Sequence, residues 1–215
     1  MPGLAQIERQ VQRHALTIAG GVQKTTRPLP DGLETLLMIA PDGPRFWAHF
    51  TQSPEYRDGQ PDPMDRWSVR VIDALAHELG ARAFYPFGAR PPHPFFTWAL
   101  ASGQARSSPV QWLIHDRQGL WLSFRGALGF AVAIDLPAAT PAPCDPCTRP
   151  CVSACPVGAL TDQGYDIPAC HAFLDTPAGA DCMNNGCAVR RACPVSQAFG
   201  RDPEQSAFHM RHFHP

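Results

Sequence analysis

The sequence contains a single lysine, Lys24, so nearly all of its positive charge comes from arginine. Acidic and basic side chains almost cancel, which gives a net charge of −1 and an isoelectric point near 6.7. Proteins that bind nucleic acid usually carry a basic excess on one face. Because that excess is missing, we do not expect a nucleic-acid partner.

Long apolar segments are missing as well. The N-terminal segment has charged side chains near its start and no apolar stretch of the kind found in a secretory leader. The longest mostly apolar run, residues 127–139, is too short to cross a bilayer and contains Asp135 and Pro137. We therefore expect a soluble, cytoplasmic protein without a membrane partner.

Familiar catalytic patterns are also absent from the sequence. There is no glycine-rich phosphate-binding loop, and no Ser/His/Asp set or pair of carboxylates stands out. Hydrophobic residues make up 44% of the chain and charged residues 17%, a balance that favours an ordered globular protein over a disordered one.

Cysteine, in contrast, is concentrated in one segment, since all eight cysteines lie between Cys144 and Cys193. The first run, CDPCTRPCVSACP, ends on Cys155-Pro156, and a second run, CMNNGCAVRRACP, also ends on Cys-Pro. Cys170 stands between them. Closely spaced thiolates that end on Cys-Pro, present twice, are typical of a small module that holds two iron–sulfur clusters. Such clusters require soft sulfur ligands.

Two-cluster ferredoxins share their ligands in a crossed pattern, in which the cysteine next to proline binds the other cluster. Applied to this chain, the pattern predicts two [4Fe–4S] clusters with four ligands each. The ligands of the first cluster would be Cys144, Cys147, Cys151 and Cys193. Those of the second would be Cys155, Cys170, Cys182 and Cys187.

Other interpretations of the cysteines remain open. Cys144 and Cys147 have the spacing of one half of a zinc site, which would make this segment a zinc-held interaction module. A disulfide framework would require an oxidising compartment, which nothing in the sequence indicates. The thiols could also be unliganded.

The segment before the cysteines marks a domain boundary, because residues 135–143 (DLPAATPAP) are rich in proline and alanine. We expect an α+β protein with an α/β domain over residues 1–136 that could bind a cofactor or a partner. A linker over 137–143, a ferredoxin-like module over 144–200 and a histidine-rich tail over 201–215 would follow. The tail contains His209, His212 and His214, which could bind a metal, fold back near a cluster or be exposed.

Hydrophobic patterns predict several elements upstream of the boundary. Apolar residues at helical spacing predict a helix over 65–79 that ends at Gly80. Apolar runs on either side of a turn predict a hairpin with strands at 35–40 and 45–51. A second hairpin is expected at 110–115 and 120–125, followed by a strand at 130–134.

The cysteine segment resembles the epoxyqueuosine reductases, corrinoid-dependent enzymes that complete the tRNA base queuosine. CDPCTRPCVSACPVGAL, the lone Cys170 in IPACHAFL, and CMNNGCAVRRACP stand where that family has its cluster ligands. The resemblance implies the same assignment of ligands to clusters. It also implies a nitroreductase-like fold upstream that cradles cobalamin.

Two functions follow from these patterns. The first is a redox protein that passes electrons through two clusters to a partner protein or a bound cofactor. The second is a corrinoid- or flavin-dependent reductase related to the epoxyqueuosine reductases. The family carries a catalytic acid after a Pro-Phe pair, whereas here Pro86-Phe87 is followed by Gly88-Ala89-Arg90. This difference favours the first function.

Overall fold

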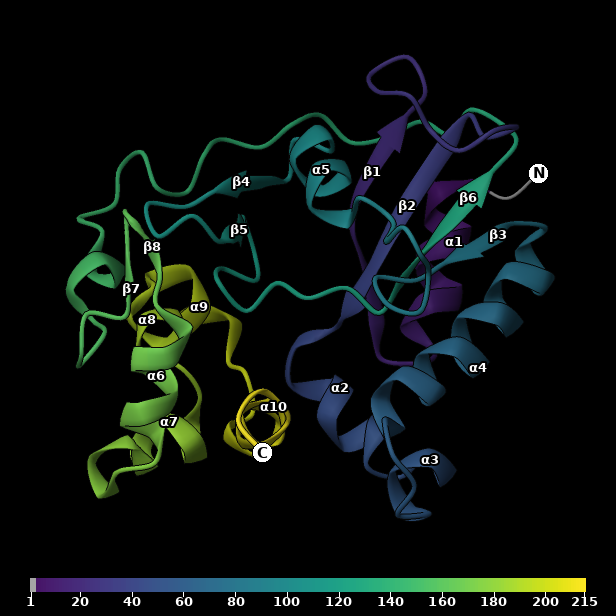
Figure 1. Cartoon of the computed structure of the whole chain (residues 1–215). Coiled ribbons are helices and arrows are strands. Elements are labelled where there is room, and N and C mark those ends of the chain that lie inside the picture. The colour runs from purple at the N-terminus through teal and green to yellow at the C-terminus, as the bar shows by residue number, and fades with distance from the viewer. Residues whose placement is uncertain (1–2) are drawn as a thin grey trace. The chain divides into compact units, whose positions relative to one another are not determined.

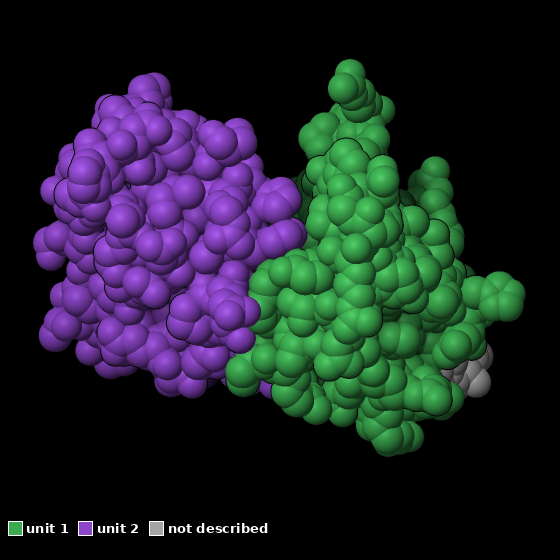
Figure 2. All heavy atoms as spheres, turned by 90° about the horizontal axis from the view of Figure 1, so that it is seen from below, with its two compact units in different colours: residues 1–105, 123–140 green, residues 106–122, 141–215 purple. Residues whose placement is uncertain are grey.

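The computed structural model describes residues 3–215 and has a mixed α+β fold (Figure 1). The chain divides into two compact units, coloured separately in Figure 2. Unit 1 takes the chain up to residue 105 together with residues 123–140, and unit 2 consists of residues 106–122 and 141–215. Residues 106–122 precede the proline-rich segment in the sequence and yet pack with the cysteine-containing segment. Within residues 3–215, no helix combines the length and apolar character needed to span a membrane.

Unit 1 is built on a four-stranded antiparallel sheet. Its strand order is β1 (Leu16–Gln23), β2 (Thr35–Pro41), β6 (Gly126–Phe130) and β3 (Arg82–Phe84). Every residue of β2 is buried, so both faces of this strand are covered. This explains why residues 35–40 form a continuous apolar run instead of alternating with polar residues.

Helices α1 (Leu4–Gln12) and α4 (Pro63–Leu79) contact each other and the sheet, α1 at β1 and α4 at β3 and β6. The predicted helix over 65–79 is therefore confirmed. It starts two residues earlier than expected, because Pro63 fits the first turn of a helix, where no amide hydrogen bond is lost. It ends as predicted at Gly80, whose φ of 64° is left-handed.

The predicted hairpin over residues 35–51 is wrong in its second half. β2 pairs with β1 and β6, and the following residues form helix α2 (Gly43–Phe50). Phe46, Trp47 and Phe50 are buried on one side of this helix, and the rings of Phe46 and Phe50 both contact Trp67 of α4. Aromatic residues at this spacing fit a helical face as well as a strand, and Pro44 in the first turn favours the helix.

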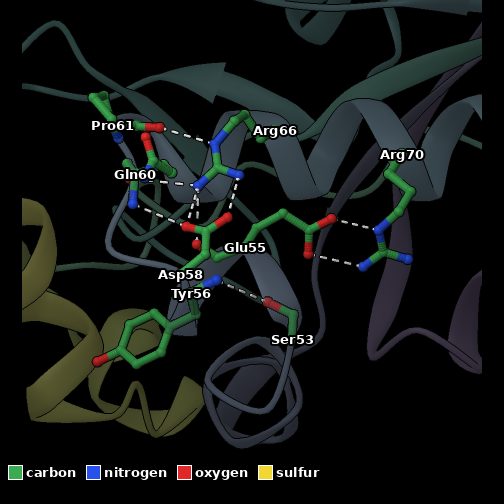
Figure 3. A network of polar contacts seen from close by, with 8 residues as sticks. All are labelled: Ser53, Glu55, Tyr56, Asp58, Gln60, Pro61, Arg66 and Arg70. Atoms are coloured by element: carbon green, nitrogen blue, oxygen red, sulfur yellow. Dashed lines mark hydrogen bonds and ion pairs between the residues drawn. The ribbon is translucent and has the colours of Figure 1, made fainter.

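A short helix, α3 (Pro54–Arg57), is joined to α4 by two ion pairs (Figure 3). The buried Glu55 faces Arg70, whose Nη2 donates a 3.0 Å hydrogen bond to Glu55 Oε2. Arg66 pairs with the more exposed Asp58 through two hydrogen bonds of 2.8 Å. Glu55 of α3, Asp58 directly after it and two arginines of α4 thus fix the connection between the two helices.

Two strand predictions near the boundary are also corrected. The strand expected at 130–134 lies instead at 126–130 and contains both Gly126 and Gly129. Only glycine fits at these two positions of the strand. A Cβ at Gly126 would lie 2.6 Å from Ile72, and one at Gly129 would lie 2.5 Å from Leu33. In the second expected hairpin, β5 (Leu113–His115) pairs with β4 (Ala105–Ser107), and residues 120–125 form no strand.

The remaining helix of unit 1 is α5 (Phe95–Ala101), which contacts β1. Unit 2 consists of short elements around the cysteines. Besides β5 and most of β4, they are in chain order η1 (Pro150–Ser153), β7 (Leu160–Thr161), β8 (Gly164–Tyr165), α6 (Ile167–Leu174), η2 (Pro177–Gly179), α7 (Ala180–Asn185), α8 (Ala188–Ala192), α9 (Pro194–Phe199) and α10 (Pro203–Phe213). The histidine-rich tail is thus largely the helix α10, which packs against α7.

Candidate metal centre

The eight cysteines lie in loops and at the ends of short helices of unit 2. Cys144 and Cys147 precede η1, Cys151 lies within it, and Cys155 follows it. Cys170 is on α6, where Pro168 occupies the first turn, and Cys182 is on α7. Cys187 and Cys193 precede α8 and α9 directly. All eight are free thiols.

Four of these thiols surround one pocket with a volume of about 370 Å³. The cysteines that line it are Cys144, Cys147, Cys151 and Cys193. They are the four residues that the crossed pattern assigns to the first cluster. Ser108, Ile114 and Leu120 form part of the wall, so the segment 106–122 contributes to this pocket.

The same four thiols influence one another electrostatically. Burial raises the pKa of Cys144, and the nearby Cys151, Cys147 and Cys193 raise it further. The pKa of Cys151 is also raised, first by burial and then by Cys193 and Cys147. The raised pKa values favour the neutral thiols, and a bound cation would favour the thiolates instead.

The other four cysteines form a second set. Burial raises the pKa of Cys170, with further contributions from Cys155 and Cys182 and an opposing one from a hydrogen bond with Tyr165. The pKa of Cys187 is raised mainly by burial and also by Cys182. These links join the four residues that the crossed pattern assigns to the second cluster.

Hydrogen bonds to cysteine sulfur occur in both sets. The amide of Arg149 donates to Cys147 Sγ at 3.3 Å, and the amide of Ala159 donates to Cys155 Sγ at 3.2 Å. The Tyr165 hydroxyl donates to Cys170 Sγ at 3.3 Å. Arg149 has a φ of 59°, a left-handed conformation that is unusual for a residue with a side chain. Donors of this kind stabilise thiolates and tune the metals that thiolates bind.

Both sets adjoin one apolar core. Cys151 and Cys193 are buried in it together with Val110, Leu120 and Val189, and Cys155 and Cys187 pack against its edge. The segment 106–122 therefore supplies apolar side chains that the cysteine segment lacks. The sequence alone gave no sign that this segment belongs with the cysteines.

Four thiols around one pocket are the kind of ligand that an iron–sulfur cluster requires. Each thiolate of a [4Fe–4S] cluster binds a different iron, so the four sulfurs stand around the group instead of converging on one point. A zinc ion instead draws four ligands to about 2.3 Å. Within residues 3–215, no three histidine, cysteine, aspartate or glutamate side chains lie close enough together to hold one metal ion.

The histidines of the tail have separate neighbours. His212 Nδ1 lies 2.8 Å from the carbonyl oxygen of Phe208, one turn earlier in α10. His214 Nε2 lies 2.8 Å from Asp175 Oδ1, just beyond α6. The ring of His209 lies against that of Phe208. The structure therefore does not bring these three side chains together.

Two residues beside the second set were not singled out from the sequence, namely Tyr165 and Arg190. Tyr165 lies five positions before Cys170, and its hydrogen bond depends on the turn between β8 and α6. Arg190 stacks on Trp112, with its guanidinium carbon 4.4 Å from the ring centroid. Neither contact has a signature in sequence spacing.

Comparison with known proteins finds no matching family profile, no matching curated protein and no matching solved structure.

Proposed function

We propose that unit 2 holds two [4Fe–4S] clusters and that the protein transfers single electrons between a donor and an acceptor. One observation carries the proposal. Cysteines from both ends of the cysteine segment, Cys144 and Cys193 among them, line the same pocket in the combination expected for one cluster. The ferredoxin-like character of unit 2 is part of this proposal.

The second set lies between the members of the first set in the sequence, and this arrangement supports electron transfer. Cys151 of the first set and Cys155 of the second are joined by the single turn of η1. Cys187 of the second set and Cys193 of the first flank the short helix α8. Two such short connections between the sets would hold the two groups close together, and short separation favours transfer between them.

The residues around the sulfurs would bind and tune the groups. The amides of Arg149 and Ala159 and the hydroxyl of Tyr165 supply donors to sulfur, and the apolar core limits access of water. Two [4Fe–4S] clusters, when bound, would supply one-electron chemistry over potentials that depend on such contacts. The electron would come from a one-electron donor and leave to a redox protein or a bound cofactor.

The experiment is electron paramagnetic resonance of protein purified without oxygen and reduced with dithionite. The proposal predicts signals from two clusters whose spins interact because the clusters are close. Isolated signals from a single cluster, or no signal from protein that contains no iron, would overturn it. Addition of cobalamin or flavin to the reduced protein then separates two kinds of redox protein. Cluster-dependent reduction of the added cofactor indicates a reductase, and no reaction indicates a carrier.

A further inference from the structure

The second set of cysteines has a side-chain hydrogen-bond donor beside it. The Tyr165 hydroxyl lies 3.3 Å from Cys170 Sγ. The ring is held on two sides, since Trp112 meets it edge-on at 5.6 Å and Phe213 of α10 stacks on it at 6.2 Å. A phenol is protonated at neutral pH, because its ordinary pKa is about 10. Tyr165 is therefore a fixed donor to this sulfur.

The same set has a positive charge beside it. Arg190 of α8 is partly buried, and its Nη1 donates a 2.5 Å hydrogen bond to the Leu120 carbonyl oxygen. Its guanidinium lies over Trp112, and its charge acts on Cys187 and on Tyr165. An arginine keeps its charge at any ordinary pH.

No acidic side chain cancels this charge. Among the ion pairs of residues 3–215, none involves Arg190, whereas the neighbouring Arg191 is paired with Asp181. A partly buried arginine without a carboxylate partner is costly unless an anionic group lies nearby. The thiolates of the second set would be that group.

The corresponding contacts of the first set are more exposed to solvent. The amide of Arg149 donates to Cys147 and the charge of Arg149 acts on Cys144, but Arg149 is an exposed residue. Reduction adds a negative charge to a cluster, so hydrogen bonds to sulfur and nearby cations raise its potential. The two sets therefore differ in the property that decides which is reduced first.

We infer that Tyr165 and Arg190 give the cluster bound by Cys155, Cys170, Cys182 and Cys187 the higher potential, so that it accepts the first electron. This inference rests on the proposed function. In the singly reduced protein, the electron would then reside on the cluster of the second set, and the cluster of the first set would have the lower potential. Tyr165 and Arg190 would act through the ligand sulfurs, as tuning residues.

The test is an anaerobic redox titration followed by electron paramagnetic resonance, on the full chain and on Tyr165→Phe, Arg190→Gln and Arg190→Lys. Two reduction steps are expected in the unchanged protein. Tyr165→Phe and Arg190→Gln should each move the higher step to lower potential and leave the lower step in place. Arg190→Lys, which keeps the charge, should move it less than Arg190→Gln.

Two matched variants serve as controls. Arg191→Gln removes the same charge one residue away, and Tyr85→Phe removes a hydroxyl that bonds Asp73 in unit 1. Neither should shift the higher step. Iron content is measured for every variant, because a variant that loses its cluster gives no potential. If Arg190→Gln loses iron, the potentials of Tyr165→Phe and Arg190→Lys test the inference.

The inference is overturned if Tyr165→Phe leaves the higher step unchanged or moves the lower one. Two iron-loaded clusters with unshifted potentials would contradict this inference alone. An unchanged protein without iron would contradict the proposed function itself. The two failures are thus distinguishable.

Discussion

The amide of Leu120 donates a 2.8 Å hydrogen bond to Ser196 Oγ, which joins the turn of segment 106–122 to helix α9, directly after Cys193. Both groups are buried. Gly119 makes the approach possible, because a Cβ at this position would lie 2.4 Å from the Ser196 amide nitrogen. The position of Cys193 therefore depends on a contact with a segment that precedes the linker in the sequence.

Gly119→Ala should destabilise unit 2 and release iron from the first set. The new methyl group would meet the Ser196 backbone, and a φ of 57° adds about 1 kcal/mol of strain for a residue with a Cβ. Thermal unfolding and iron content of the anaerobic protein measure the effect.

Gly200→Ala is the matched control for this change. Gly200 has a similar φ of 67°, but no atom lies within 4 Å of the added Cβ. It should show the backbone strain alone and keep its iron. Equal losses in the two variants would show that the contact with Ser196 does not matter.

Single exchanges of cysteine for serine should reveal how the ligands are shared. In the crossed arrangement, Cys193→Ser removes the same cluster as Cys144→Ser, and Cys155→Ser removes the same cluster as Cys187→Ser. Each variant should keep about half of the iron, because one [4Fe–4S] group remains. The resonance signal of the remaining cluster identifies which one was lost.

An assignment of the ligands by their order in the sequence predicts a different result. If the first four cysteines held one cluster, Cys155→Ser would match Cys144→Ser in its remaining signal. That result would contradict the crossed arrangement while leaving two clusters in place.

Acid should weaken unit 1 through Glu55. The hydrogen bond from Arg70 holds the pKa of Glu55 below its usual value, although burial acts in the opposite direction. Because the folded pKa is below the unfolded one, this stabilisation is fully present above about pH 4.3 and is lost as pH falls through the folded value. Urea unfolding at several pH values measures it.

Arg70→Met should therefore cost about 1–3 kcal/mol at pH 7, because it leaves the buried Glu55 carboxylate without its partner. The cost should shrink as the pH falls and Glu55 becomes protonated. Arg66→Met, which breaks the more exposed pair with Asp58, is the comparison and should cost less. A cost for Arg70→Met that is independent of pH would contradict the role assigned to the charge of Glu55.

Residue patterns predicted part of this fold and missed features that depend on distant contacts. The apolar residues of α4 were sufficient to predict this helix, because Trp67, Val71 and Leu75 recur every four residues and are buried on one side of it. The division of the eight cysteines into two sets remains a prediction from their spacing and the following prolines, and four of them line one pocket in the structure. Helix α2 was missed because Phe46, Trp47 and Phe50 fit either a strand or a helix until Trp67 packs against them.

Contacts between distant segments account for the remaining differences. Strand β6 contains glycines because Ile72 and Leu33 approach it closely, and neither is near it in sequence. Arg190 bonds Leu120, seventy positions away, so its place beside the cysteines follows only from the fold. Helix α10 was likewise not predicted from the sequence, and in the structure it packs against α7.

The most direct test of the iron–sulfur proposal is the iron and acid-labile sulfide content of the full chain purified without oxygen. Two [4Fe–4S] clusters require about eight iron and about eight sulfide per chain. The protein should be brown, and dithionite should bleach its visible absorption. A colourless protein with zinc in place of iron and no labile sulfide would contradict the proposal.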